Sequence, residues 1–325
     1  MMNFPKVSIL IPVYNRAKII LETLNSAVNQ TYKNIEIIVV DNKSTDNTFE
    51  VLKEFAKSHP NVRSYQNKKN IGPVRNWRKC LDYATGEYVK ILWSDDLIAP
   101  TFIEKTLPYL VNNEDIGFVF TGTEIFNDDT GKRIKAYFIG KTGIYDSEEF
   151  IRGSLLGGLF PVSPGCALFR KKDVERNLLI DIPNKVGTDF KMRAIGNDLL
   201  IYLLTAKDYP KFAFIDETLS FFRSHQESLT ISTKSSDVAI LYNIAKAYFV
   251  ENYVKDEKLK RKFNTKLFYC YLRNRNNNIG LKSPKDFYVK KDNLCINYGY
   301  LLKLLVGKIT DKFKKSLEKE RGFSR

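Results

Sequence analysis

The sequence predicts an open α/β fold, and two observations carry this prediction. Short apolar runs typical of buried strands alternate with longer segments in which apolar residues recur at helical spacing. Such alternation favours parallel strands joined by right-handed crossovers, whose helices cover both faces of one sheet. A chain of 325 residues with 43% hydrophobic residues can bury the core that this fold requires.

Four strands and four helices are predicted in the first 112 residues. The apolar strand runs are VSILIPV, IEIIVVD, VRSYQ and YVKILW, at residues 7–13, 35–41, 62–66 and 88–93. The helical patterns cover residues 17–30, 47–58, 73–84 and 101–112. We therefore expect a Rossmann-like sheet. Because ligands of open α/β sheets bind beyond the carboxyl ends of the strands, the residues directly after each strand are candidates for a site.

The predicted strand ends carry carboxylates and amides instead of a glycine-rich phosphate loop. The first turn has no GxGxxG, and the GKT at residues 140–142 has Lys135 where a P-loop requires glycine. The polar residues after the strands are Asn15, Asp41, Asp46, Asn70, Asn76, Asp95 and Asp96. A single such residue often caps a helix. Several carboxylates at one edge repel each other unless a divalent cation or ligand donors offset the charge.

The order of these motifs resembles the inverting family-2 glycosyltransferases with the GT-A fold. The segments that carry the resemblance are VSILIPVYNRAKIILETLNSAVNQTYKNIEIIVVDNKSTDNT and NIGPVRNWRKCLDYATGEYVKILWSDD. It implies a catalytic domain over residues 1–231, with a nucleotide-sugar half at about 5–130 and an acceptor half at 131–231. Residues 232–325 would form a helical, basic C-terminal extension. The implied enzyme moves a sugar from a nucleoside-diphosphate sugar, with a UDP-sugar favoured, to an acceptor hydroxyl with inversion.

The resemblance also implies which residues bind the donor. The turn that contains Pro12, Tyr14 and Asn15 would line the nucleotide, and Asp41 would accept hydrogen bonds from the base or ribose. Asn70, Arg75 and Asn76 would lie near the same edge. Arg75 would reach a phosphate, although an arginine at a helix start can instead pair with a neighbouring acid.

The segment KILWSDDLIAP is the candidate corner for the diphosphate and a metal. Similar enzymes present Asp-x-Asp here and bind Mg²⁺ or Mn²⁺ through the second Asp. In this chain Trp93 takes the first acidic position and Asp95 the second, with Ser94 and Asp96 beside it as donor-binding residues. Mg²⁺ binds few protein ligands and keeps waters, so one carboxylate can suffice. Alternatively, the two acids cap the next helix or pair with a buried arginine.

The second half of the chain offers a general base and a second metal ligand. Asp198 opens the apolar run LLIYLL, where similar enzymes place the base, and Asn197 replaces the usual preceding Glu. Asp189 is the fallback base, and a helix cap is the alternative role of Asp198. The motif R-x-H-x-x-S recurs in similar enzymes, and the resemblance implies that Arg223 lies with the donor and that His225 binds the metal or the diphosphate, which would compensate for the acid lost at Trp93. A core or surface role is the alternative for His225.

The C-terminal quarter carries most of the net positive charge. Residues 251–325 hold 20 Lys and Arg against 8 Asp and Glu, and the whole chain has a net charge of +15. Residues 237–275 are predicted to be helical, with a break at 274–278, and residues 298–321 form an amphipathic pattern. This last helix either docks on the catalytic domain or lies on an anionic membrane, where a lipid-linked sugar or other glycan acceptor would be found.

Composition narrows the remaining classes. No signal-peptide core and no apolar stretch of about 18 residues is present, so we expect a cytoplasmic protein, either free or peripheral on the inner face of the cell membrane. The four cysteines form no metal or disulfide pattern. The resemblance suggests bacterial polysaccharide, lipopolysaccharide or capsule synthesis. The alternatives are a nucleotidyltransferase, a basic nucleic-acid-binding protein and a catalytically silent relative. We expect no nucleic-acid partner, because the excess charge sits in a tail without recognised RNA or DNA motifs and the carboxylate-lined edge repels phosphates unless a metal intervenes.

Overall fold

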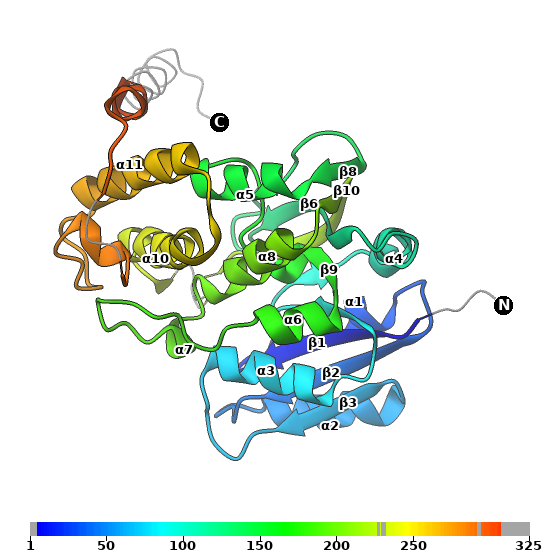
Figure 1. The fold of residues 1–325 in the computed structure, drawn as a ribbon. Helices are drawn as coiled ribbons and strands as arrows, with labels where there is room; N and C mark the ends of the chain where they lie inside the picture. Colours follow the sequence, from blue (N-terminus) through cyan, green and yellow to red (C-terminus); the bar gives the residue numbers. More distant parts are fainter. Residues whose placement is uncertain (1–4, 226–227, 229–231, 291–293, 307–325) are drawn as a thin grey trace, which may run out of the picture.

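The computed structural model describes residues 5–225, 228, 232–290 and 294–306. Its centre is one sheet with the strand order β3-β2-β1-β4-β9-β6-β10-β5, and β7 and β8 pair with β6 and β10 at its margins (Figure 1). Helices cover both faces of this sheet. The predicted open α/β fold is therefore confirmed.

The first half of the chain forms the parallel part of the sheet. Its strands are β1 (Val7–Val13), β2 (Ile35–Asp41), β3 (Val62–Gln66) and β4 (Tyr88–Ile91). Its helices are α1 (Ile20–Val28), α2 (Thr48–Ser58), α3 (Pro73–Tyr83) and α4 (Phe102–Val111). β1 and β2 are buried along their whole length, which explains why they read as unbroken apolar runs. β4 ends two residues earlier than predicted, because the chain turns at Trp93, whose carbonyl accepts from the Asp96 amide.

The part of the chain from residue 97 to residue 223 adds antiparallel pairs to the same sheet. Its strands are β5 (Leu97–Ile98), β6 (Ile116–Phe126), β7 (Arg133–Ala136), β8 (Gly143–Asp146), β9 (Ala167–Arg170) and β10 (Lys211–Arg223). β9 lies antiparallel between β4 and β6, and β10 runs parallel to β6. The connecting helices are α5 (Ser147–Leu156), η1 (Pro164–Cys166), α6 (Lys171–Asn177), α7 (Phe190–Arg193) and α8 (Asn197–Asp208).

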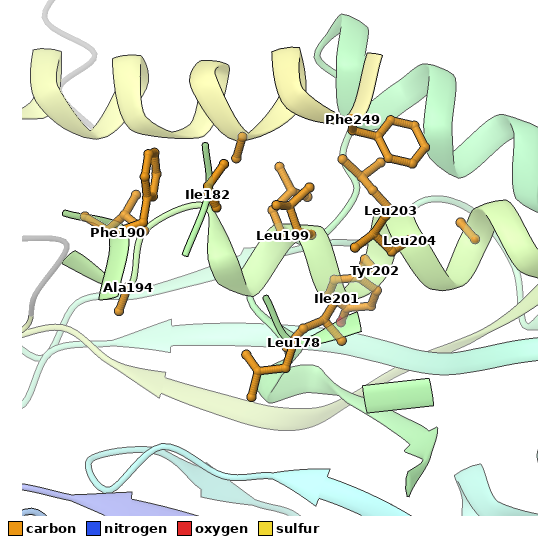
Figure 2. Packing of buried hydrophobic residues seen from close by; sticks show 14 of the residues in the cluster. Leu178, Ile182, Phe190, Ala194, Leu199, Ile201, Tyr202, Leu203, Leu204 and Phe249 are labelled. Atoms are coloured by element: carbon orange, nitrogen blue, oxygen red, sulfur yellow. The ribbon is translucent and has the colours of Figure 1, made fainter. Parts of the chain in front are cut away.

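The C-terminal region is helical and packs on the sheet domain through α8. It contains α10 (Ser235–Tyr253), α11 (Glu257–Arg273) and η2 (Pro284–Phe287), with a helical segment at residues 298–306. Figure 2 shows Leu199 and Leu203 of α8 directed toward α10, which carries Phe249. These residues belong to one hydrophobic cluster that continues across the predicted boundary at residue 231. The prediction of an amphipathic helix up to residue 321 extends beyond the described residues.

Two expectations from composition can be compared with the structure. Cys80, Cys166 and Cys270 are buried and Cys295 is exposed, and all four are free thiols. Within the described part of the chain, every helix is too short or too polar to span a membrane.

Candidate active site

A cavity of about 890 Å³ opens where β1, β4 and β10 end. Its walls come from segments that are far apart in the sequence and meet at one edge of the sheet. The residues singled out in the sequence that line it are Pro12, Tyr14, Asn15, Asn70, Asn76, Trp93, Ser94, Asp95, Asp96, Asp198 and Arg223. The sequence therefore placed most of its candidates at one cavity.

The turn after β1 is held by the loop after β2. Asn15 adopts a positive φ of 52°, which asparagine tolerates better than most residues. Its side-chain oxygen accepts from the Thr45 amide at 2.8 Å, and its own amide donates to Ser44 Oγ at 2.8 Å. These contacts present Tyr14 at the cavity with 40% of its surface exposed.

Four asparagines form a hydrogen-bonded ladder behind this turn. Asn42 donates to Asn70 at 2.9 Å and accepts from Asn67 at 3.0 Å, and Asn67 also donates to Asn76 at 2.8 Å. Asn76 in turn donates to the Val40 carbonyl at 2.8 Å. Because each buried amide has a partner, the ladder is a rigid polar surface. Asn42, Asn70 and Asn76 line the cavity from it.

Two predicted donor residues lie outside the cavity lining. The Asp41 carboxylate is fully buried and accepts from Gln66 at 2.8 Å and from the Ser44 amide and hydroxyl. Its oxygens are therefore turned into the loop that follows β2. Arg75 is exposed on α3, and its position there does not bring it to the cavity wall.

Asp95 lies between two basic side chains. His225 Nε2 is 2.9 Å from Asp95 Oδ2, and an Arg16 guanidinium nitrogen is 3.6 Å from the same oxygen. All three side chains are mostly buried, with 14 to 19% of their surface exposed. The structure thus brings together the two predicted metal ligands and adds a cation that the sequence reasoning missed.

Asp96 is buried below this corner and accepts from the Arg223 amide at 2.9 Å. Burial raises the pKa of its carboxyl, and the charge of Asp95 raises it further. Lys90 of β4 is fully buried nearby, donates to the Gly165 carbonyl and lies 4.3 Å from the Phe102 ring centroid. Burial lowers the pKa of Lys90 to about 7, and the charges of Cys166 and Asp96 oppose this shift.

Trp93, which the sequence comparison placed at the first acidic position, forms an aromatic part of the cavity wall. Its ring lies 4.7 Å from that of Trp77, and its indole N–H donates to Ser163 Oγ at 2.8 Å. A Cβ on Gly165 would come within 3.1 Å of the indole and of Phe222, so the indole packs tightly against this turn and any larger residue would displace it. Trp93 therefore ties the end of β4 to the loop that precedes β9.

Arg223 joins the two sides of the cavity edge. Its Nε donates to the Asp95 carbonyl at 3.0 Å, and its guanidinium pairs with Glu22 at 2.6 Å and with Asp128. Its side chain is only 7% exposed. A guanidinium with these three partners holds the turn that carries Asp95 and Asp96 against β10 and α1.

Asp198 reaches the cavity from the first turn of α8. Its Oδ1 accepts from the amides of Gly196 and Leu199, each at 2.8 Å, and its Oδ2 accepts from the Tyr242 hydroxyl at 2.8 Å. Burial raises the pKa of this carboxyl to about 6, against the lowering effect of these hydrogen bonds. Asp198 is therefore ionised near neutral pH and protonated by modest acidification.

Asn197 and Asp189 do not line the cavity as Asp198 does. Asn197 donates to the Leu179 and Ile180 carbonyls, at 2.8 and 3.3 Å, so it anchors a loop outside the cavity lining. Asp189 accepts from the Lys191 amide at 2.9 Å and caps α7. Of the two candidate bases, only Asp198 lines the cavity.

Several cavity residues were missed by the sequence reasoning. They are Arg16, Asn42, Trp77, Tyr137, Ser163 and Tyr242. Arg16 and Asn42 directly follow strand-end residues that were chosen, so a wider window around each strand end would have included them. Tyr242 had no such signal, because it reaches Asp198 only through the packing of α10 on α8.

Asp95 and His225 are the protein groups that fit a divalent metal. An oxygen and a neutral imidazole nitrogen are ligands that Mn²⁺ accepts, and Mg²⁺ needs few protein ligands. No cluster of three or more His, Cys, Asp or Glu residues that could bind a metal occurs among residues 5–225, 228, 232–290 and 294–306. Diphosphate oxygens and waters would have to complete such a site.

The mixed sheet and the cavity at its strand ends define an α/β protein with a ligand site beyond its strands, similar to GT-A glycosyltransferase structures. Residues 8–178, more than half of the chain, match the model of Glycosyl transferase family 2, and the chain belongs to this family. It is 30% identical over 190 residues to the minor teichoic acid biosynthesis protein GgaB of Bacillus subtilis, which covers 57% of this chain and 20% of that protein. The chain spans 36 to 53% of the length of the first three curated relatives that it matches.

Solved structures show the same fold. A fragment of TarS from S. aureus, determined with UDP-GlcNAc, superposes with a TM-score of 0.62 over 85% of this chain and 76% of that one. The mannosyltransferase PcManGT of Pyrobaculum calidifontis, determined with GDP-Man and Mn²⁺, gives a TM-score of 0.55 over 84% and 72%. Both are 19% identical to this chain, and their likeness supports the fold.

Proposed function

We propose that this protein transfers a sugar from a nucleoside-diphosphate sugar to an acceptor hydroxyl with inversion at the anomeric carbon. The observation that carries the proposal is the position of Asp198. A buried carboxylate with a pKa of about 6 lines the same cavity as Asp95 and Arg16. One side of the cavity thus offers a base and the other offers charged groups for a diphosphate.

Asp198 acts as the general base in this reaction. It takes the proton from the acceptor hydroxyl as that oxygen forms a bond to the anomeric carbon, and the bond to the diphosphate oxygen breaks with its electron pair. The two amides and the Tyr242 hydroxyl hold the carboxylate in place. A pKa of about 6 leaves it ionised at neutral pH and still basic enough to accept the proton.

The donor lies on the opposite side. The turn with Pro12, Tyr14 and Asn15 and the asparagine ladder face the nucleoside, and the guanidinium of Arg16 faces the diphosphate. We favour a UDP-sugar, since the TarS fragment was determined with UDP-GlcNAc. Asp95 and His225 would hold Mg²⁺ or Mn²⁺, which supplies positive charge for the departing diphosphate.

The acceptor class is a glycan or lipid-linked sugar in polysaccharide synthesis, in line with the similarity to a teichoic acid protein. We further propose a cytoplasmic protein that binds an anionic membrane surface through its C-terminal region. Tyr298 and Leu302 are 78 and 63% exposed, and α11 begins with several exposed basic side chains. Removal of residues 297–325 should reduce co-sedimentation with anionic vesicles; unchanged binding would contradict the membrane role.

A donor screen tests the proposal. Thermal stability is measured with each common nucleoside-diphosphate sugar, in Mg²⁺ or Mn²⁺ and in chelator. We expect one donor to raise the midpoint of unfolding more when metal is present. If every donor fails and a nucleoside triphosphate stabilises the protein with release of pyrophosphate, the nucleotidyltransferase alternative is correct instead.

A further inference from the structure

The C-terminal helix α10 contacts the candidate base directly. Tyr242 lies in the second turn of α10, 44 residues after Asp198, and its hydroxyl donates to Asp198 Oδ2 at 2.8 Å. Tyr242 also lines the cavity. It lies outside residues 8–178, the span that matches the family model. A residue from the extension is therefore part of the site.

Helix α10 packs against the turn that carries Asp198. Gly196 has a φ of 107°, and a Cβ at this position would lie 2.9 Å from the Ala245 Cβ and 3.3 Å from the Leu241 carbonyl oxygen. Only glycine allows both this backbone conformation and this close approach. The Gly196 amide is one of the two that bind Asp198 Oδ1. The packing of α10 thus positions both carboxylate oxygens of Asp198, Oδ2 through Tyr242 and Oδ1 through the Gly196 turn.

We propose that Tyr242 is a positioning residue for the general base, so that α10 of the C-terminal region completes the catalytic centre. The proposal rests on the assignment of Asp198 as the base. Each carboxylate oxygen has two lone pairs. Tyr242 occupies one lone pair of Oδ2, and the two backbone amides bind Oδ1. The second lone pair of Oδ2 therefore remains for the acceptor hydroxyl.

The hydroxyl also favours the charged form of the base. A hydrogen bond donated to a carboxylate lowers its pKa, and Tyr242 is the largest such contribution at Asp198. The other titratable groups that interact with Asp198 are Tyr137, after β7, and Tyr202 of α8. Burial raises the pKa of both phenols, so they stay neutral. Arg193 of α7 lines the same cavity.

The test is the pH profile of kcat/KM for Tyr242→Phe. The substitution keeps the ring and removes the hydroxyl, so the acidic limb should move up by about one pH unit. The loss of rate should be largest at acidic pH and shrink as the pH rises. The matched control is Tyr248→Phe, the same change on the same helix at a residue outside the cavity lining; its acidic limb should stay in place.

The residue that causes the acidic limb of the pH profile also has to be identified, because Asp96 lines the same cavity and its pKa is raised too. Tyr242 contacts Asp198, so a shift of the limb in Tyr242→Phe identifies Asp198 as its owner. An unchanged limb in a folded Tyr242→Phe protein would overturn the proposal. Equal shifts in both tyrosine variants would overturn it as well, since they would show a general effect of the helix.

A second measurement separates this proposal from the assignment of the base. The carboxyl resonance of Asp198 is identified by its loss in Asp198→Asn and titrated by NMR in the wild type and in Tyr242→Phe. We expect its pKa to be higher in the variant, and an equal pKa contradicts the role of Tyr242. If Asp198→Asn keeps full turnover while the pKa of Asp198 still rises in Tyr242→Phe, Asp198 is not the base and the proposed function is wrong. The hydrogen bond between Tyr242 and Asp198 would still be supported.

Discussion

The two sides of the cavity are built in different ways. On the donor side, the strand-end residues of β1, β2 and β4 bind one another, as in the asparagine ladder and the cluster around Asp95. On the base side, Asp198 is buried among apolar groups and its only side-chain partner is a neutral tyrosine, among the contacts described. The Asp95 carboxylate on the donor side therefore has basic partners, while Asp198 on the base side has no ion-pair partner among the contacts described, and burial disfavours its charged form. This difference matches a donor that is bound and a base that reacts.

The largest expected effect follows from removing the charge on the base side. Asp198→Asn should lower turnover by about 10² to 10⁴-fold, since a general base typically contributes this much. The same change should favour stability at higher pH. The pKa of Asp198 is raised from 3.8 to about 6 in the folded protein, so its carboxylate destabilises the fold as the pH rises through this range.

Denaturant unfolding at pH 4 and pH 8 measures this second effect. Relative to the wild type, Asp198→Asn should gain about 2 kcal/mol in the free energy of unfolding between the two pH values. A variant that lost both activity and stability equally at both pH values would show that Asp198 has a structural role alone.

On the donor side, Asp95→Asn tests the metal corner. It should lower turnover by about 10²-fold and abolish the metal-dependent part of the donor stabilisation, because the carboxylate that would hold the metal beside the diphosphate is lost. Asp96→Asn is the comparison. Since burial and Asp95 already raise the pKa of Asp96, a neutral amide should cost less there. A larger loss in Asp96→Asn would reverse the assignment of the two acids.

The sequence predicted Arg75 as the phosphate-binding arginine, whereas the structure places Arg16 at the cavity. Arg16 lies 3.6 Å from Asp95 at the cavity, whereas Arg75 is exposed on α3. Arg16→Gln should raise the KM for the donor about tenfold, the effect of losing one charged hydrogen bond. Arg75→Gln should change it by less than about twofold, as exposed charges contribute little. The opposite ranking would restore the phosphate role to Arg75.

The smallest expected effect concerns Trp93. Trp93→Phe removes the hydrogen bond to Ser163 and should lower the free energy of unfolding by about 1 kcal/mol. Ser163→Ala should cost more, because Ser163 Oγ also accepts from the Gly165 amide at 3.3 Å, and the double variant should cost little more than Ser163→Ala alone, since both single changes break the contact with Trp93. Full additivity in this double-mutant cycle would show that the hydrogen bond does not stabilise the loop before β9.

The sequence predicted the donor side better than the base side for a physical reason. Strands β1 and β2 are locally encoded by buried apolar runs, and the residues that follow the parallel strands must meet at one sheet edge. Pro12, Asn15, Asn76 and Asp95 could therefore be chosen from the chain alone. Asp41 could not be placed, because the direction of its side chain depends on Gln66 and Ser44.

The base side depends on tertiary packing. Asp198 was found through its place before an apolar helix, but its partner Tyr242 comes from a helix whose packing leaves no local signal. The same holds for Arg16 and Asp95, whose contact joins two strand ends. Long-range contacts of this kind set the pKa of Asp198 and the charge around Asp95, and neither can be read from spacing.

The most direct test compares the two candidate bases under single-turnover conditions with saturating donor. Asp198→Asn and Asp189→Asn are matched changes on neighbouring segments, one inside the cavity lining and one that caps α7. We predict that sugar transfer falls by at least about 10²-fold in Asp198→Asn, while donor binding stays within a few fold and Asp189→Asn transfers at close to the wild-type rate. Near-normal transfer by Asp198→Asn, with a loss in Asp189→Asn, would contradict the assignment of Asp198 as the general base.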